Sequence, residues 1–212
     1  MDAKAWNQRY ASREPVWSLE PNVFVVRELL GETPGTAVDL AAGEGRNAIW
    51  LARHGWRVTA VDFAQAGLDR GAALAGDLPI TWVCADVTTW TAPLPVGLVL
   101  VAYLQLEPHA RAAAVGNAWR SLAVGGTLLW VAHDSSNLTE GTGGPTDPAV
   151  LMTAEDVLAD LDAIGAAYGV VSAGRVARQV TDGAGHVHGH VHGHETVTQT
   201  AWDCLVRVVR QG

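Results

Sequence analysis

The sequence predicts an α/β fold in which a mostly parallel sheet carries helices on both faces. Short apolar runs alternate with helical patterns along most of the chain, and this alternation favours parallel strands joined by right-handed crossovers. One run, Val96–Leu104, is apolar almost throughout, as expected for a strand covered on both faces. The last two strand patterns have no helix between them and can pair only as an antiparallel hairpin. We expect residues 1–212 to form a single domain.

The expected strands are short apolar runs that end at glycines, prolines or polar residues. In chain order they are Thr36–Ala42, Arg57–Phe63, Ile80–Asp86, Val96–Leu104, Thr127–Ala132, Val170–Val180 and Gln199–Arg210. The expected helices lie between them, with one more before the first strand. They are Asn22–Leu30, Arg46–His54, Gln65–Ala75, Pro108–Leu122 and Thr153–Ile164. Pro108 suits a first helical turn, and Thr153 is a suitable N-cap. The segment Ser135–Ala149 is rich in glycine and proline and is expected to be a loop.

Charge and composition exclude several classes of partner. The net charge is −8 and no basic stripe occurs, which disfavours binding to nucleic acid. No apolar run reaches the roughly 18–20 residues of a membrane span, and the first residues lack an apolar signal core. Cys84 and Cys204 lie far apart and match neither a zinc spacing nor a disulfide framework. These features predict a cytoplasmic protein that does not bind membranes, and they say nothing of its oligomeric state.

The segment Val38–Ala48 carries the strongest chemical signal. It follows an expected strand and opens an expected helix, and Gly43 and Gly45 lie at the turn. Glycines there let the backbone approach a ligand closely, and the first amides of the helix point toward it. Asp62 ends the next strand, 19 residues after Gly43, where a carboxylate binds ribose hydroxyls in nucleotide-binding sheets.

Two cofactors fit this arrangement. The spacing Gly43-x-Gly45-x-x-Ala48 satisfies the dinucleotide fingerprint, which is weak on its own. Other features favour S-adenosylmethionine. Asp39 precedes the loop, and an acid there suits a cofactor that carries a sulfonium and an ammonium but no phosphate; Asp39 can also be a structural acid that binds loop amides. Asp86 ends the third strand, within reach of an adenine edge. No lysine occurs after position 4, which disfavours a nicotinamide oxidoreductase.

The sequence resembles the class I S-adenosylmethionine-dependent methyltransferases, in particular the small tellurite-resistance-type and thiopurine-type branch. The resemblance covers roughly residues 5–180. It rests on Trp6-Asn7-Gln8-Arg9-Tyr10, on Trp17 with Glu20-Pro21-Asn22, on residues 38–64, on Ala85-Asp86-Val87, on Val101-Ala102-Tyr103-Leu104 and on Val124-Gly125-Gly126-Thr127. The insertion from His186 to Glu195 departs from the usual family pattern.

The resemblance implies a Rossmann-like seven-stranded sheet of order 3-2-1-4-5-7-6 with the last strand antiparallel. It also implies that the glycine loop contacts the methionine part of the cofactor, that Asp62 holds the ribose, and that Asp86 and Val87 flank the adenine. The N-terminal segment 1–35 would cover the cofactor. The expected cofactor-binding residues are Asp39, Ala41, Gly43, Gly45, Asn47, Asp62, Phe63, Asp86, Val87, Tyr10 and Trp17.

Candidate catalytic residues follow the fourth and fifth expected strands, because ligands of open α/β sheets bind at the carboxyl ends of the strands. They are Tyr103 and His133, with Gln105 and Asp134 beside them. His133 is the best candidate for a general base, and its alternative role is to hydrogen-bond neighbouring backbone. Methyl transfer is an in-line displacement in which alignment alone supplies much of the rate, so a base is not obligatory.

Residues 183–197 form a histidine-rich loop between the last two expected strands. It contains His186, His188, His190, His192 and His194, one at every second residue, with Glu195 after them. In an extended chain these imidazoles face one side, and neutral imidazole suits zinc, nickel, copper or cobalt. The alternative is a polar connector that binds metal only weakly.

The leading hypothesis is therefore methyl transfer from S-adenosylmethionine to a small-molecule acceptor. A second hypothesis is a cofactor-binding fold whose histidine-rich loop binds or senses a divalent transition metal. A nicotinamide oxidoreductase is the third.

Overall fold

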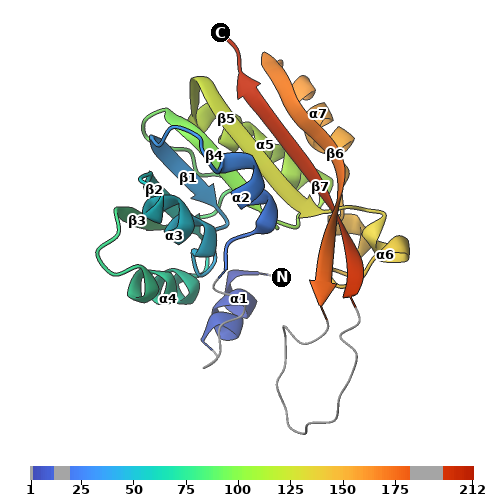
Figure 1. Ribbon diagram of the computed structural model, residues 1–212, viewed down its shortest axis with the longest axis horizontal. Helices are drawn as coiled ribbons and strands as arrows, with labels where there is room; N and C mark the ends of the chain where they lie inside the picture. The colour runs from blue at the N-terminus through green and yellow to red at the C-terminus, as the bar shows by residue number, and fades with distance from the viewer. Residues whose placement is uncertain (1, 12–19, 182–197) are drawn as a thin grey trace, which may run out of the picture.

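The computed structural model describes residues 2–11, 20–181 and 198–212, which form a seven-stranded sheet with helices around it (Figure 1). The strands are β1 (Thr36–Leu40), β2 (Arg57–Asp62), β3 (Ile80–Cys84), β4 (Val96–Ala102), β5 (Leu122–His133), β6 (Tyr168–Thr181) and β7 (Thr198–Arg210). The helices are α1 (Ala3–Tyr10), α2 (Val23–Leu29), α3 (Arg46–Arg53), α4 (Gln65–Ala75), α5 (Pro108–Ser121), α6 (Asn137–Glu140) and α7 (Ala154–Ala163), with a 3-10 turn at Pro148–Val150.

The strand order is β3-β2-β1-β4-β5-β7-β6, which confirms the expected order. Strands β1 to β5 pair in parallel, so their carboxyl ends meet at one edge of the sheet. Strand β7 runs antiparallel to both β5 and β6, as the missing helix between the last two strand patterns predicts. The carboxyl ends of β1, β2, β4 and β5 are the place where this topology collects polar side chains.

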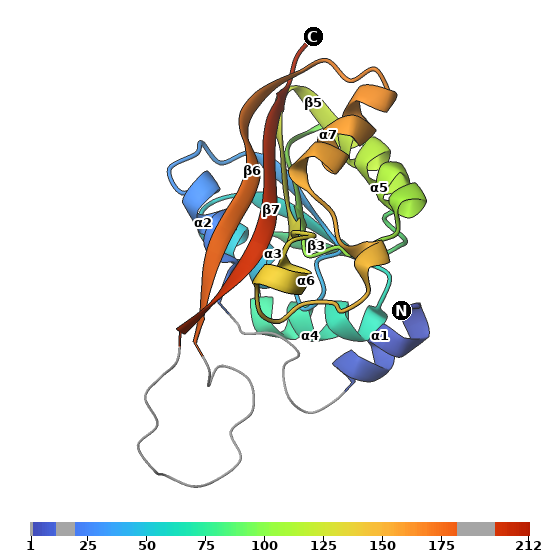
Figure 2. The same cartoon turned by 90° about the vertical axis from the view of Figure 1, so that its right-hand side faces the viewer.

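Two layers of helices cover the sheet. Helices α2 and α3 pack on one face, and α5 and α7 pack on the other (Figure 2). Successive residues of β4 alternate between the two cores: Leu98 and Leu100 join the first, and Val99 and Val101 join the second. All four are buried, which explains why this strand is apolar almost throughout.

Some element boundaries differ from those expected. Strand β5 begins at Leu122 rather than at Thr127, because Leu122 already pairs with Val96. The register between β4 and β5 then shifts, and Gly125, with φ +79°, belongs to this irregularity within the strand. The segment expected to be only a loop, Ser135–Ala149, contains α6 and the start of the 3-10 turn. Helix α1 was not expected.

Within the described part of the chain, no helix combines the length and the apolar character that crossing a bilayer requires. Cys84 is exposed and Cys204 is buried, and both are free thiols.

Candidate active site

The glycine loop joins β1 to α3 through three left-handed residues. Ala41, Gly43 and Gly45 have φ values of +57°, +57° and +73°. A side chain on Gly43 would place its Cβ 2.6 Å from the Tyr10 hydroxyl, so this position tolerates only glycine. The backbone amide of Gly43 donates to Asp62 Oδ2 at 2.8 Å, which ties the loop to the end of β2. The loop thus presents bare backbone at the carboxyl edge of the sheet.

Gly45 has a different role from Gly43. It is the N-cap of α3, and a Cβ there would collide with the indole of Trp82 from β3. The same indole blocks a Cβ on Gly71 of α4. Gly45 therefore lets Trp82 pack beneath the loop, and it is not among the residues that line the cavity described below. Its contact with the methionine part of a cofactor stays a prediction.

Asp62 ends β2 as predicted, whereas Asp86 follows the last residue of β3, Cys84, by two positions. Asp62 is 4 % exposed, and it accepts from Ala64 N through Oδ1 as well as from Gly43 N, each at 2.8 Å. Burial raises the pKa of Asp62 above its usual value, although these backbone hydrogen bonds act to lower it. Asp86 is exposed and accepts from the backbone and hydroxyl of Thr88 through Oδ1. Both carboxylates line the cavity.

Asp39 lies beneath the loop and is 1 % exposed. Among the described residues its Oδ2 has no hydrogen-bond partner, which is a costly state for a buried carboxylate. Burial raises the pKa of Asp39 to about 7, although the Ala48 amide and the charge of Arg46 oppose the rise. A positive charge bound at the loop would stabilise the ionised form.

This raised pKa predicts how Asp39 contributes to stability. A carboxyl whose folded pKa exceeds its unfolded value stabilises the fold below the unfolded pKa and loses that contribution as pH rises through the folded pKa. The unfolding free energy of the wild type, measured against Asp39→Asn, should therefore fall between pH 4 and pH 8. The upper limit is about 4 kcal/mol, from 1.36 kcal/mol per pKa unit. Urea unfolding at several pH values checks it. Asp69→Asn, an exposed acid on α4, is the control, and a difference independent of pH would contradict the prediction.

A cavity of about 1420 Å³ opens over the carboxyl ends of β1, β2, β4 and β5. This exceeds the roughly 300–1,000 Å³ of ordinary small-molecule sites, so it has room for a cofactor and a second ligand. The candidate residues that line it are Tyr10, Ala41, Gly43, Asn47, Asp62, Phe63, Asp86, Val87, Tyr103, Gln105 and His133. Most of the predicted cofactor residues thus meet in one cavity, and Asp39 lies behind it.

Helix α1 borders this cavity. Tyr10 is buried and its ring stacks on Trp6 with a centroid separation of 5.4 Å. Asn7 Oδ1 accepts from Ala66 N at 2.9 Å and so fixes α1 against α4. Trp17, the other predicted N-terminal contact, lies outside the described residues.

The rings of Tyr103 and His133 lie against each other with an interplanar angle of 32°. Their ring centroids are 4.7 Å apart, and Tyr103 has a strained φ of +60° at the end of β4. The Tyr103 hydroxyl donates to Asp203 Oδ2 at 2.8 Å, and burial raises the tyrosine pKa. His133 Nδ1 lies 3.2 Å from Asp203 Oδ1, although the angle is unsuitable for a well-formed hydrogen bond.

The His133 ring is also held from its other side. A Cβ on Gly144 would lie 3.0 Å from the imidazole, so only a glycine lets this loop cover the ring. The Gln105 side-chain amide bridges two backbone groups: its oxygen accepts from the N–H of His133 at 2.8 Å, and its nitrogen donates to Val150 O. The imidazole is therefore fixed at the cavity wall. Asp134 instead accepts from Ser136 and serves the local turn.

Sequence reasoning missed Asp203, Arg178 and Arg46. Asp203 is fully buried in β7, directly opposite His133 in the β5–β7 register. Arg178 of β6 donates through Nε to Asp203 Oδ2 at 2.7 Å. Burial alone would raise the pKa of Asp203, but the neighbouring His133 and the hydrogen bonds from Arg178 and Tyr103 hold it below its usual value. In the sequence, the signal for Asp203 was its position as a single carboxylate within an apolar strand pattern.

The predicted metal ligands His186, His188, His190, His192 and His194 lie outside the described residues. The described part of the chain contains no cluster of three or more histidine, cysteine or acidic side chains suited to a metal ion.

Residues 37–126 match the family model described as a methyltransferase domain. The chain has a methyltransferase fold. It resembles the N-methyltransferase NodS from Bradyrhizobium japonicum WM9, solved in complex with S-adenosylhomocysteine, with a TM-score of 0.72 and 19 % identity over 99 % of this chain and 98 % of that one.

Two other solved structures share this methyltransferase fold. TehB from Haemophilus influenzae gives a TM-score of 0.64 and 16 % identity over 99 % of this chain and 67 % of that one. The glycopeptide N-methyltransferase MtfA, complexed with sinefungin, gives 0.63 and 17 % over 96 % and 91 %. No curated protein sequence matches the chain.

The residues present fit the cofactor of this fold. The glycine loop lets the Tyr10 hydroxyl approach the Gly43 backbone, where a Cβ would collide with it, and the Oδ2 of Asp39, which has no hydrogen-bond partner among the described residues, suits a nearby cation. The acids around the loop are unfavourable for a pyrophosphate and acceptable for a sulfonium and an ammonium. The domain match and the fold support an enzyme that transfers methyl groups from S-adenosylmethionine.

Proposed function

We propose that this protein methylates a small-molecule acceptor with S-adenosylmethionine at the cavity over β1, β2, β4 and β5. The observation that carries the proposal is the buried carboxylate of Asp39 near the Gly43 loop, whose Oδ2 has no hydrogen-bond partner among the described residues. A cationic cofactor relieves the burial of that carboxylate, whereas the phosphates of a dinucleotide would be repelled by it.

Each cofactor residue then has a defined role. Ala41 and Gly43 border the methionine part, Asp62 accepts from the ribose hydroxyls, and Asp86 with Val87 and Phe63 borders the adenine. Asn47 acts indirectly, because its Oδ1 already accepts from Asn22 N at 2.9 Å and so joins the start of α2 to α3. Tyr10, and Trp17 from the undescribed part of the N-terminal segment, cover the cofactor.

On the acceptor side, the chain holds a base and shields it. When bound, S-adenosylmethionine supplies an electrophilic methyl group on a sulfonium. His133 accepts the proton that an oxygen or nitrogen acceptor loses as it attacks that methyl group. Asp203 holds His133 and Tyr103 in fixed positions, and the Tyr103 ring supports the imidazole. Gly144 packs closely against the His133 ring.

The proposal is tested by ligand-dependent thermal unfolding. S-adenosylhomocysteine should raise the melting temperature, since a ligand at 100 times its Kd adds about 2.7 kcal/mol to stability, and NADH should not. Stabilisation by NADH alone would overturn the proposal. A screen of small-molecule acceptors with methyl-labelled cofactor would then identify the substrate.

His133→Ala should lower kcat for that acceptor by roughly 10²–10⁴, the usual contribution of a positioned base, and added imidazole should restore part of it. S-adenosylhomocysteine should bind the variant as it binds the wild type. His109→Ala is the matched control, because His109 is exposed on α5. An unchanged kcat would leave alignment alone as the source of the rate.

The histidine-rich loop of residues 183–197 supports a second proposal from spacing alone: His186, His188, His190, His192 and His194 bind a divalent transition metal. Calorimetry with zinc, nickel and copper at pH 7.5 should show binding tighter than that of the free peptide. Affinity should fade as pH falls through about 6.5, because imidazole must be neutral to ligate. Equal affinity of protein and peptide would make the loop a connector.

Three narrower points also remain proposals. The sequence motifs around Tyr10, Trp17 and the glycine loop favour the tellurite-resistance and thiopurine branch of these enzymes. The acidic charge favours a small-molecule acceptor over nucleic acid. We also propose a cytoplasmic, single-domain protein without membrane partners.

A further inference from the structure

Two arginines flank Tyr103 inside the cavity. Arg46 is the first residue of α3, and its Cζ lies 6.0 Å from the centroid of the tyrosine ring. Arg178 reaches the same ring from β6, with its Cζ 5.5 Å from the centroid. Both side chains line the cavity, as does His133, whose ring contacts that of Tyr103.

Among the described residues, Arg46 has no acidic side chain in direct contact, unlike other shielded arginines, although the charge of Asp39 acts on it. Arg70 pairs with Glu44 at 2.6 Å, and Arg111 pairs with Asp160 at 2.7 Å. No carboxylate lies within 4.0 Å of the Arg46 guanidinium among the residues that the structure places, and burial lowers its pKa. A partly desolvated cation that contacts no carboxylate favours an anionic ligand.

Arg178 is only partly neutralised. It donates to Asp203 through Nε at 2.7 Å and through Nη2 at 3.5 Å. That carboxylate also accepts from the Tyr103 hydroxyl and lies beside His133. Two guanidinium groups thus flank the Tyr103 ring, and among the described residues only that of Arg178 contacts the buried Asp203 carboxylate.

We propose that the methyl acceptor carries a carboxylate, which Arg46 and Arg178 bind over the face of Tyr103. This inference rests on the proposed methyl transfer and adds the chemical class of the acceptor. The sheet order favours the acceptor as the source of the anion. The cofactor loop lies at β1 and β2, whereas Arg178 comes from β6, at the opposite edge of the sheet. Guanidinium groups bind carboxylates in a two-pronged geometry, which here positions the acceptor next to His133.

The test uses benzoate and benzamide as probes on protein saturated with S-adenosylhomocysteine. Ligand-observed NMR titrations should show that benzoate binds about tenfold or more tightly than benzamide, as expected for charge-assisted hydrogen bonds. Arg46→Gln and Arg178→Lys should each reduce this preference several-fold. Arg178→Lys keeps a cation beside the buried Asp203, so its fold is retained, and Arg46→Lys should recover part of the preference lost in Arg46→Gln.

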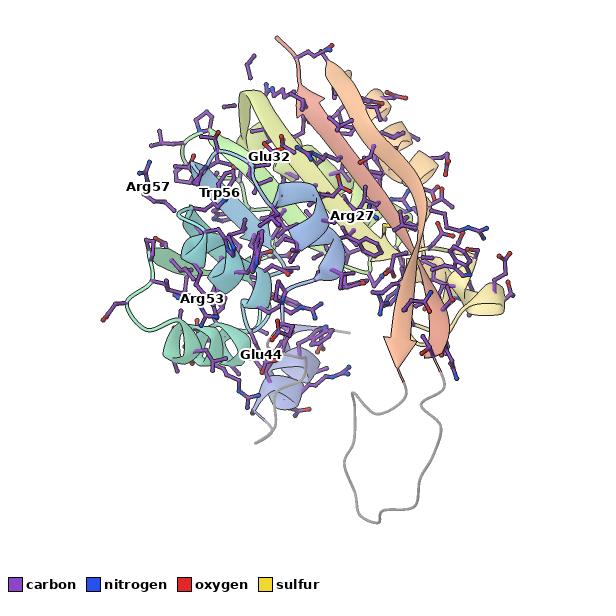
Figure 3. All side chains as sticks on the ribbon, viewed as in Figure 1. Arg27, Glu32, Glu44, Arg53, Trp56 and Arg57 are labelled. Atoms are coloured by element: carbon purple, nitrogen blue, oxygen red, sulfur yellow. The ribbon has the colours of Figure 1, made fainter. Side chains whose placement is uncertain are left out.

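Arg57→Gln is the matched control, because Arg57 is exposed at the start of β2, far from the loop residue Glu44 (Figure 3). Equal binding of the two probes, or a preference that persists in both arginine variants, would overturn the proposal. The proposal would also be overturned if the arginine variants bound S-adenosylhomocysteine more weakly but bound 5′-methylthioadenosine as the wild type does. The second ligand lacks the amino-acid carboxylate, so this result would mean that the arginines bind the cofactor. Failure of wild-type protein to bind S-adenosylhomocysteine would overturn the proposed function itself.

Discussion

Gly43→Val should abolish binding of S-adenosylhomocysteine. Gly43 has φ +57°, a conformation that a β-branched residue avoids, and its Cβ would lie 2.6 Å from the Tyr10 hydroxyl. The branched side chain would also fill the space where the bare backbone of the loop meets the cofactor. Because Gly43 N donates to Asp62, a shift of the loop would also displace the Asp62 carboxylate. Calorimetric titration of the folded variant measures the effect.

Gly76→Val is the control for backbone strain. Gly76 has the same φ of +57°, but nothing lies within 4 Å of the Cβ that it would carry. It should cost stability and leave the affinity for S-adenosylhomocysteine unchanged. A second variant, Gly43→Val with Tyr10→Ala, separates collision with Tyr10 from filling of the ligand space. Full binding by Gly43→Val would show that the loop is not the cradle.

The fold was predictable because its signals are local. Each strand and most helices are visible in the sequence as an apolar run or a helical periodicity within about ten residues. The absence of a helix before the last strand indicates the antiparallel hairpin. The start of β5 was misplaced because Gly125 and Gly126 are typical of a turn. Only pairing of Leu122 with Val96, which is tertiary, makes that segment a strand.

The candidate site was predictable on its cofactor side for the same reason. Gly43, Asp62 and Asp86 follow strand ends, and the parallel topology brings strand ends together. The acceptor side depends on register instead. Asp203 meets Tyr103 across 100 residues and Arg178 across 25, and these contacts exist only once β5, β7 and β6 are aligned. The local sequence pattern does not reveal the register in which these strands pair.

Asp62→Ala should weaken S-adenosylhomocysteine binding more than tenfold, consistent with the 1.5–3 kcal/mol of hydrogen bonds to a charged group. The structure adds a second reason, since Asp62 also accepts from Gly43 N and Ala64 N and so shapes the loop. Calorimetry gives the affinity. Asp69→Ala, which removes an exposed acid from α4, should leave it unchanged.

The two roles of Asp62 can be separated with a ligand that lacks a ribose hydroxyl. Wild-type protein should bind S-adenosylhomocysteine about tenfold more tightly than its 2′-deoxy or 3′-deoxy analogue, whichever hydroxyl the carboxylate accepts from. Asp62→Ala should bind parent and analogue equally, because the acceptor for that hydroxyl is gone. If the variant loses affinity for both ligands but keeps the discrimination, Asp62 only shapes the loop. The ribose is then held by another group at the carboxyl edge of β2, and Asp62 is not the anchor.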